Sequence, residues 1–296
     1  MTGDPADRAA FEVLDTGALT LLCDLGRPGF AALGVSGSGA ADRAAYRLGQ
    51  RLVGQNYQHA ALEVTFGGLA LRCRTRAWVA LTGADARATL AGRAVGHGAA
   101  FEVQADQELV LGVPERGLRT YVSVRGGFAV PPVLRSRSSD VLSGLGPDPL
   151  KPGQLLAIGP ASAGWEFEPV EFAPTAWPLG PGPIELAIVP GPRDDWFVGG
   201  LARLVGSGWV VSAESNRVGV RLSGPVLERR SGLGELVSEP MVRGSVQVPP
   251  NGRPVVFGAD HPVTGGYPVI GVLTPTASDR IAQARPGDEI RFVTRG

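Results

Sequence analysis

Short apolar runs separated by glycine turns make up most of the chain from Gly17 to Gly159. The runs are rich in Val, Leu, Thr and aromatic residues, and they read "ALTLLCDLG", "LEVTFGGLALRC", "WVALTG", "FEVQADQELVLG", "RTYVSVRGG" and "QLLAIG". Runs of about four to eight such residues are typical of half-buried β-strands. Residues 38–54 instead repeat their apolar positions at helical spacing, with Asp42 in the first turn and Gly54 at the end. We therefore predict a β domain with one early helix.

The same pattern returns in the last third of the chain. Residues 160–183 carry six prolines and no clear period, which is typical of a connector. Strand-like runs then resume with "IELAIVPGP", "WVVSAES", "VGVRLSG", "GSVQVPP", "PVVFGA" and "PVIGVLT", and only "DDWFVGGLARLVG" and "ASDRIAQA" look helical. Both halves end on a Pro-Gly turn that leads into a final strand. The pattern favours two β-barrel domains over one long sandwich.

Length and composition agree with two folded domains. The chain has 296 residues, of which 44% are hydrophobic and 19% charged, so each half can bury a core of its own. We predict an N-terminal extension at 1–16, a first β-barrel domain at 17–159, the proline-rich connector at 160–183 and a second β-barrel domain at 184–296.

Charge and lysine content argue against several functions. Lys and Arg together number 28, as do Asp and Glu, so the formal net charge is zero and a nucleic-acid partner is not expected. Lys151 is the only lysine, and it precedes a proline, so neither a Schiff base nor a phosphate-binding lysine loop is expected. "GSGAAD" begins like a dinucleotide-binding motif but lacks the third glycine and the βαβ context.

Cysteine and histidine placement narrows the chemistry further. Cys23 and Cys73 lie in apolar runs without CxxC spacing, which favours buried, reduced thiols over a disulfide. No apolar run approaches about 18 residues and no signal-peptide pattern opens the chain, so we expect a soluble cytoplasmic protein with no membrane partner. His59, His97 and His261 lack further ligands at metal spacing, so no metal site is expected. We expect structural roles for the first two histidines, whereas His261 remains a candidate.

Arginines beside small hydroxylic residues and glycines recur in three stretches. The residues are Arg125 in "VRGGF"; Arg135, Arg137, Ser138, Ser139 and Asp140 in "RSRSSD"; and Ser215, Asn216, Arg217 and Arg221 in "ESNRVGVRLSG". Guanidinium groups beside hydroxyl and backbone N–H donors bind carboxylate, phosphate or bicarbonate. Each arginine could instead pair with an acid or cap a turn. Three such stretches together favour a cleft that binds an anion.

The bend "HPVTGGYPVI" at 261–270 is a further candidate. Its two glycines, Gly265 and Gly266, permit positive φ and close approach of a ligand, while Thr264 and Tyr267 offer hydroxyls. A plain hairpin is the alternative, and a ligand-facing turn is favoured.

These stretches occur in the order and spacing of a known family. "GRPGFAALGVSGSGAADRAAYRLGQRLVG", "ALEVTFGG", "TGADARATLAG", "YVSVRGGF", "VLRSRSSDVLSGLG", "ESNRVGVRLSG", "GSVQVPPNGRPVVFGAD" and "TGGYPVIGVLT" resemble the biotin-dependent carboxyltransferase family, from about Gly17 to Val293. That family includes the C subunit of bacterial 5-oxoprolinase, formerly named allophanate hydrolase subunit 2, and part of the carboxyltransferase region of urea carboxylase.

The resemblance implies a mainly β fold of two antiparallel barrels of cyclophilin-like type. It implies a hydrolase subunit that uses ATP in a complex to open 5-oxo-L-proline, a small cyclic amide, to L-glutamate. The implied partners are a protein of related barrel fold that is like the B subunit of 5-oxoprolinase, and a protein like its A subunit. Under this hypothesis Arg137, Asp140 and His261 are catalytic, with Asp140 positioning Arg137 or a water. The predicted substrate-binding residues are Arg125, Ser138, Asn216, Arg217, Thr264, Gly265, Gly266 and Tyr267.

Two alternatives remain open under the same resemblance. One is a carboxyltransferase that moves CO₂ from carboxybiotin to urea or a related amide, with biotin carried by another protein because no Met-Lys-Met stretch occurs here. The other is a non-catalytic antagonist that binds a kinase-inhibitor partner. The chain departs from the family pattern at Ala41, where methionine is usual, and at "HPV" before "TGGYP", where glutamine and threonine are frequent.

Overall fold

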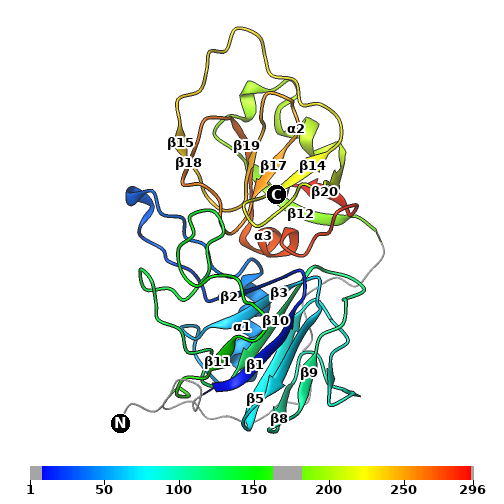
Figure 1. Ribbon diagram of the computed structural model, residues 1–296. Coiled ribbons are helices and arrows are strands. Elements are labelled where there is room, and N and C mark those ends of the chain that lie inside the picture. Colours follow the sequence, from blue (N-terminus) through cyan, green and yellow to red (C-terminus); the bar gives the residue numbers. More distant parts are fainter. Residues whose placement is uncertain (1–8, 163–181, 295–296) are drawn as a thin grey trace. The chain divides into compact units, whose positions relative to one another are not determined.

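The computed structural model describes residues 9–162 and 182–294, and these residues form a mainly β structure with few short helices (Figure 1). The mainly β prediction is therefore confirmed. The chain divides into two compact units, and each is described here by itself. Among the described residues, unit 1 holds 9–27, 42–140 and 144–162, and unit 2 holds 28–41, 141–143 and 182–294. Of the predicted connector, residues 163–181 lie outside the described residues.

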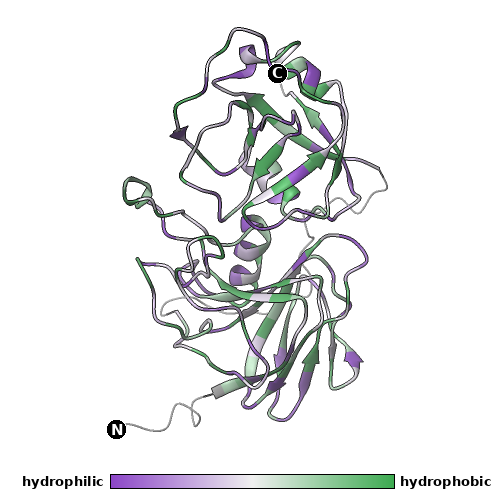
Figure 2. Cartoon of the chain, turned by 45° about the horizontal axis from the view of Figure 1, so that its top comes forward, coloured by the Kyte–Doolittle hydropathy of each residue, from purple (hydrophilic) through white to green (hydrophobic). Residues whose placement is uncertain are grey.

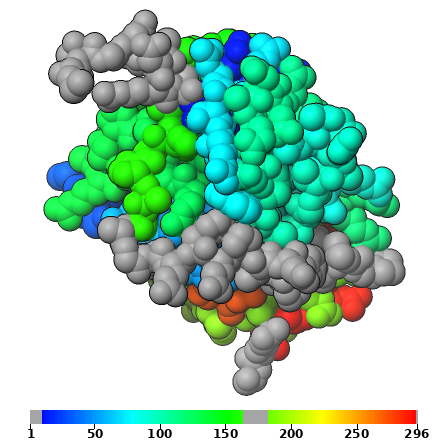
Figure 3. Space-filling view, turned by 90° about the horizontal axis from the view of Figure 1, so that it is seen from below, coloured from blue at the N-terminus to red at the C-terminus, as the bar shows by residue number. Residues whose placement is uncertain are grey.

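Unit 1 is built from two antiparallel sheets. The six-stranded sheet has the order β11 (Leu155–Ala157), β1 (Ala9–Thr16), β4 (Leu69–Cys73), β9 (Glu108–Val110), β6 (Thr89–Leu90), β7 (Arg93–Ala94). The five-stranded sheet has the order β2 (Leu19–Cys23), β3 (Ala61–Thr65), β10 (Arg119–Val124), β5 (Ala77–Gly83), β8 (Ala100–Val103). In the view from below, cyan atoms from near residue 75 lie between green atoms from near residue 150 and blue-green atoms from near residue 100 (Figure 3). Segments that are distant in sequence therefore lie side by side.

The core of unit 1 lies between these sheets. Strand β10 is buried along its whole length, and the rings of Phe11 and Phe128 pack with centroids 5.9 Å apart. Burial of each such side chain stabilises the fold by about 1.5–3 kcal/mol. Figure 2 shows apolar and polar residues mixed along the strands of this unit, as expected for sheets with one buried face.

The prediction that residues 1–16 form an N-terminal extension is wrong for residues 9–16, which form strand β1. Residues Phe11 and Val13 are only 1% and 0% exposed, and β1 pairs with β4 on one side and β11 on the other. The run "AAFEVLDT" therefore belongs to unit 1, because its apolar residues complete that core.

Helix α1 (Arg43–Leu52) is the early helix predicted from the sequence. It begins one residue after Asp42, whose side chain accepts a hydrogen bond from Ala45 N at 2.9 Å and so caps the helix. The helix packs against β5 and β10. Gly49 permits this close packing, because a Cβ there would lie 3.1 Å from Thr82 Oγ1.

Unit 2 contains a closed barrel. Its strand order is β12 (Ile184–Pro190), β19 (Val269–Leu273), β16 (Ser245–Gln247), β17 (Val255–Phe257), β14 (Gly219–Ser223), β13 (Gly208–Val211), β20 (Glu289–Val293). The barrel closes through a parallel pair, β12 with β20, whereas its other pairs are antiparallel. Helices α2 (Gly200–Val205) and α3 (Pro275–Ile281) contact barrel strands. Two further elements, β15 (Glu239–Pro240) and β18 (Thr264–Gly265), form a separate pair.

Two short segments expected in the first barrel belong to unit 2. These are residues 28–41, which include the 3-10 turn η2 (Ala31–Leu33), and residues 141–143, and each segment has one residue that donates to the Asp260 carboxylate. Ser38 Oγ donates to Asp260 Oδ1 at 2.5 Å, and Val141 N donates to Asp260 Oδ2 at 3.1 Å. A buried carboxylate needs such donors, and this explains why the two segments fold with unit 2.

Three simpler expectations can be compared with the described residues. Cys23 and Cys73 are both buried and neither forms a disulfide, as predicted. Burial raises the pKa of Cys73 to about 11. Within residues 9–162 and 182–294, no cluster of three or more His, Cys, Asp or Glu residues could hold a metal ion. No helix in these ranges is long and apolar enough to cross a membrane.

Candidate functional site

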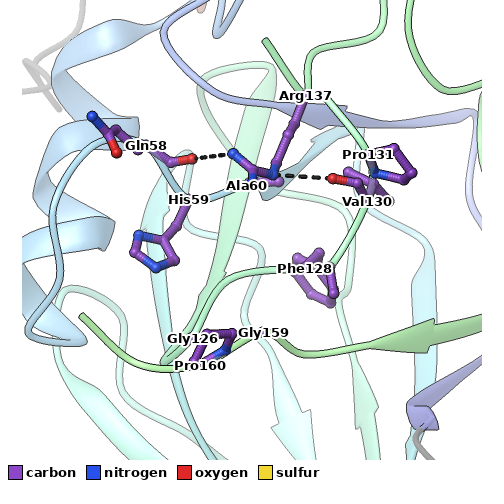
Figure 4. Close-up of a pocket in the computed structure, with 11 residues that line it drawn as sticks. Gln58, His59, Ala60, Gly126, Phe128, Val130, Pro131, Arg137, Gly159 and Pro160 are labelled. Atoms are coloured by element: carbon purple, nitrogen blue, oxygen red, sulfur yellow. Dashed lines mark hydrogen bonds between the residues drawn. The ribbon is translucent and has the colours of Figure 1, made fainter. Parts of the chain in front are cut away.

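A cavity of about 450 Å³ opens in unit 1 at the site of two sequence motifs, "RGGF" and "RSRSSD". It is lined by Gln58, His59, Ala60, Gly126, Phe128, Ala129, Val130, Pro131, Arg137, Gly159 and Pro160. Figure 4 shows the Arg137 guanidinium between two backbone carbonyls, with the His59 ring and Phe128 nearby. Among the predicted site residues, Arg137 is the one that reaches this cavity.

The glycines of "RGGF" shape the cavity. Gly126 and Gly127 have φ of 96° and 66°, a backbone conformation that other residues rarely adopt. A Cβ on Gly127 would lie 2.6 Å from His59 Cβ, and a Cβ on Gly126 would collide with the carbonyl oxygen of Gly159. The two glycines are therefore needed where three backbone segments meet.

Arg125, predicted to bind substrate, stabilises helix α1 instead. Its Nη1 donates to the carbonyl oxygens of Val53 and Gly54 at 3.0 and 3.1 Å. A cation at a helix C-terminus satisfies carbonyls that lack helical partners and interacts favourably with the helix dipole. The geometry gives Arg125 a structural role, and its predicted contact with substrate stays a prediction.

Arg137 is held with one edge of its guanidinium turned to the cavity. Nε donates to Val130 O at 3.0 Å, and Nη1 donates to Gln58 O at 2.9 Å. Nη2 donates to no residue in the described parts of the chain. The guanidinium is thus fixed by two bonds and keeps a donor for a ligand, which suits an anion.

Asp24, which sequence analysis missed, organises the "RSRSSD" loop. Its Oδ1 accepts from Ser136 Oγ and Ser138 Oγ, both at 2.7 Å, and from Gly26 N at 2.7 Å. Its Oδ2 accepts the backbone N–H of Arg137 at 2.6 Å. Ser138 is fully buried in this network, so the structure gives it a positioning role rather than contact with substrate.

Asp140 pairs with a different arginine from the one predicted. Its Oδ2 lies 3.8 Å from Arg27 Nη1, and both side chains are fully buried. Arg27 Nη2 also donates to the carbonyl oxygen of Ser138. The expected contact between Asp140 and Arg137 is not formed, because the Arg137 guanidinium donates to Gln58 and Val130 instead. That Asp140 positions a water stays a prediction.

His59, expected to be structural, faces the cavity with one nitrogen. Nδ1 lies 3.1 Å from Asn56 Oδ1, and the same oxygen accepts the backbone N–H of Gln58 at 3.0 Å. The loop is held by Tyr46 of α1, whose hydroxyl donates to the carbonyl oxygens of Tyr57 and His59 at 3.1 and 2.6 Å. Burial raises the pKa of Tyr46 far above its ordinary value, so this hydroxyl stays protonated.

In unit 2, the Arg217 side chain is buried and donates hydrogen bonds within the fold. Nε and Nη2 donate to the two oxygens of Asp260 at 2.8 and 3.2 Å, and Nη2 also donates to Gly39 O at 2.8 Å. Its side chain is 3% exposed. The neighbouring Asn216 is exposed and closes a turn by accepting from Val218 N and Gly219 N. Neither geometry resembles an open anion site.

The bend at 261–270 is partly a strand pair. Thr264 and Gly265 form β18, which pairs with β15, and neither Gly265 nor Gly266 has positive φ. Gly265 is needed for close packing instead, because a Cβ there would lie 2.7 Å from Gln247 Nε2. Tyr267 is 46% exposed and lines a second cavity of about 240 Å³, with prolines and Phe197.

His261 lies at the edge of this bend. Its Nδ1 is 2.8 Å from Pro262 O, and its ring stacks on Phe257 at a centroid distance of 5.9 Å. The residue is 9% exposed. Its catalytic role stays a prediction.

Comparison with known proteins agrees with this fold and sequence pattern. A family model described as carboxyltransferase domain, subdomain A and B, matches residues 33–294. The chain belongs to this family. This carboxyltransferase domain is 36% identical to the 5-oxoprolinase C subunit of Escherichia coli (strain K12) over 286 residues, which cover 95% of this chain and 90% of that protein. It is likewise 31% identical to the 5-oxoprolinase C subunit of Haemophilus influenzae over 286 residues, 95% of this chain and 90% of that protein.

Solved structures share the fold of this carboxyltransferase domain. The crystal structure of Kluyveromyces lactis urea carboxylase matches with a TM-score of 0.85 and 30% identity, over 98% of this chain and 28% of that one. The chain thus spans less than a third of that larger protein. The family resemblance inferred from the motifs is confirmed by these matches.

Proposed function

We propose that this chain is one component of an ATP-dependent 5-oxoprolinase, which opens 5-oxo-L-proline to L-glutamate. The observation that carries the proposal is the 36% identity to the 5-oxoprolinase C subunit over 90% of that protein's length. In this proposal the chain acts in a complex with a B-type partner of related barrel fold and an A-type partner of the same enzyme. The relatives are themselves named as one subunit of an enzyme, which supports assembly with other chains.

The chemistry explains why such a reaction consumes ATP. A lactam carbonyl is a poor electrophile because attack must break amide resonance. Transfer of a phosphoryl group to the lactam oxygen activates the carbon, water adds there, and the C–N bond breaks with its electron pair going to nitrogen, which takes up a proton. A second water then releases phosphate and leaves L-glutamate.

The cavity in unit 1 suits the lactam better than the nucleotide. Among the described lining residues, Arg137 carries the only guanidinium or ammonium group, and His59 is the only other basic side chain. One such positive charge is too little to balance the negative charge of a nucleoside triphosphate. One guanidinium edge in about 450 Å³ does match a single small carboxylate. We therefore assign substrate positioning to this chain and no step of phosphoryl transfer.

The test is reconstitution with the two partner proteins. We expect ATP hydrolysis that depends on 5-oxo-L-proline and yields L-glutamate, with no biotin protein present. Turnover only with a carboxybiotin carrier and urea would support the carboxyltransferase alternative, which the likeness to urea carboxylase favours. Partner binding without either turnover would leave the antagonist role.

A variant pair tests the cavity within that assay. Arg137→Ala removes the guanidinium edge, and we expect it to raise KM for 5-oxo-L-proline by at least about tenfold, as for loss of a charged hydrogen bond. Arg87→Ala is the matched control, because Arg87 pairs with Glu115 on the surface of the same unit. Equal kinetics in both variants would remove Arg137 from the site.

A further inference from the structure

We propose that the cavity recognises a carboxylate and an N–H group on neighbouring atoms, with Arg137 Nη2 donating to the carboxylate and His59 Nε2 accepting from the N–H. The proposal rests on the proposed function, because 5-oxo-L-proline carries its carboxylate on the carbon next to the lactam nitrogen. It makes His59 a specificity-determining residue.

The hydrogen bonds around Asn56 define the tautomer of His59. Asn56 Oδ1 accepts the backbone N–H of Gln58 at 3.0 Å, which identifies that atom as an oxygen and an acceptor. His59 Nδ1, 3.1 Å from the same oxygen, must therefore donate and carry the proton. In the neutral ring Nε2 is then unprotonated and accepts hydrogen bonds.

His59 Nε2 is available for a ligand. It makes no hydrogen bond within residues 9–162 and 182–294, and His59 lines the cavity. The ring cannot turn away easily, because Tyr46 holds the His59 carbonyl and Gly127 packs so closely on the histidine side chain that it leaves no room for a Cβ. A preorganised acceptor of this kind costs little to bring into a complex.

Arg137 supplies the complementary donor in the same cavity. Its Nη1 is bonded to the carbonyl of Gln58, the residue before His59, so the guanidinium lies beside the backbone that carries the histidine (Figure 4). Both residues line the same cavity, so one donor and one acceptor are offered to the same ligand, which matches a group with an N–H next to a carboxylate. Apolar lining from Phe128, Pro131 and Pro160 suits the methylenes of a small ring.

The arrangement predicts discrimination between two ligands of nearly equal shape. In 5-oxotetrahydrofuran-2-carboxylate, the lactone analogue, a ring oxygen replaces the N–H, so an oxygen lone pair would face the Nε2 lone pair. 2-Pyrrolidinone keeps the N–H and lacks the carboxylate. Each analogue removes one of the two contacts.

The experiment measures binding of these three compounds by NMR at pH 8, above the ordinary range in which an imidazole takes up a proton. Histidine ring signals are followed in the full chain and again in the reconstituted complex, and are assigned with His59→Gln and His97→Gln. We expect 5-oxo-L-proline to shift the His59 signals and to bind about 3- to 10-fold more tightly than the lactone. 2-Pyrrolidinone should bind at least about tenfold more weakly.

Two variants separate recognition from folding. His59→Phe removes the acceptor, and we expect lactam and lactone to bind it equally, whereas His59→Gln can restore an acceptor and part of the preference. The control His97→Gln should keep the full preference, because His97 Nε2 is bonded to Gly83 O at 3.1 Å. Equal binding of lactam and lactone by the unaltered protein, or unmoved His59 signals, would overturn the inference.

The outcomes also separate this inference from the proposed function. Glutamate formation in the complex without any His59-dependent preference would keep the oxoprolinase proposal and reject the His59 contact. The His59-dependent preference without glutamate formation would keep the recognition site and reject the oxoprolinase proposal. No binding by the chain or by the complex would reject the site.

Discussion

The carboxylate of Asp24 accepts the backbone N–H of Arg137 at 2.6 Å across a separation of 113 residues. Through this bond, the end of strand β2 sets the position of the one predicted site residue that reaches the cavity in unit 1. The same carboxylate also takes the hydroxyls of Ser136 and Ser138. Asp24 is 5% exposed, so these donors have little access to water.

We expect Asp24→Asn to destabilise unit 1 and to displace Arg137. The amide would place an NH₂ group among several buried donors, and each donor left without an acceptor costs about 1–3 kcal/mol. Urea denaturation measures the loss of the free energy of unfolding. Asp15→Asn is the control, because exposed Asp15 accepts one turn N–H, from Gly17, and its loss should stay near 1 kcal/mol or below, as is typical of surface changes. Equal effects of both variants would contradict the role given to Asp24.

Gly127→Ala tests the packing under His59. Alanine at Gly127, with φ of 66°, would place Cβ 2.6 Å from His59 Cβ, so it should cost more than the ~1 kcal/mol of backbone strain alone. Gly153→Ala is the matched variant, because Gly153 also has positive φ, 81°, and nothing lies within 4 Å of its Cβ position. Thermal unfolding of the two variants compares the costs. A Gly127→Ala protein as stable as Gly153→Ala would mean that His59 is not held as described.

We expect Arg217→Met to lower the free energy of unfolding of unit 2, and not only to weaken substrate binding. The change leaves the buried Asp260 without its guanidinium, and breaking a buried ion pair from one side costs about 3–5 kcal/mol. Arg221→Met is the control, because the Arg221 and Glu214 side chains are 53% and 80% exposed and lie 4.0 Å apart, so its effect should stay below about 1 kcal/mol. Chemical denaturation measures both. A stable Arg217→Met protein that loses substrate affinity would restore the prediction made from the sequence.

His97 should make unit 1 sensitive to mild acid. Burial lowers the pKa of His97 below its ordinary value of 6.5, although Asp85 opposes the shift. Below about pH 6.5 the unfolded chain therefore takes up a proton that the folded chain does not. The free energy of unfolding then decreases as the pH is lowered, until the pH is below the lowered pKa of folded His97. His97→Gln removes this contribution, so the difference in stability between pH 7.5 and pH 5.5 should be smaller in the variant. An unchanged pH dependence, measured by urea denaturation at both values, would contradict the shift.

Local patterns in the sequence predicted the elements of the fold. Strand runs bounded by glycines became β2, β3, β5 and β10, and the helical spacing after Asp42 became α1. These features depend on neighbours in the chain, on burial of one face and on capping. The family motifs likewise predicted the carboxyltransferase domain family that the comparisons show.

What each arginine does was decided by tertiary structure alone. In sequence, Arg125, Arg137 and Arg217 stand equally beside small or polar residues. In the structure, Arg125 binds carbonyls at the end of helix α1, Arg217 is buried against Asp260, and Arg137 lines the cavity in unit 1. Asp24 gave no signal because Ser136, Arg137 and Ser138, which donate to it, lie far along the chain. His59 gave none because its packing on Gly127 and its place in the cavity depend on distant segments. Spacing along a sequence specifies local conformation, whereas burial and the supply of donors and acceptors depend on which distant segments the fold brings together.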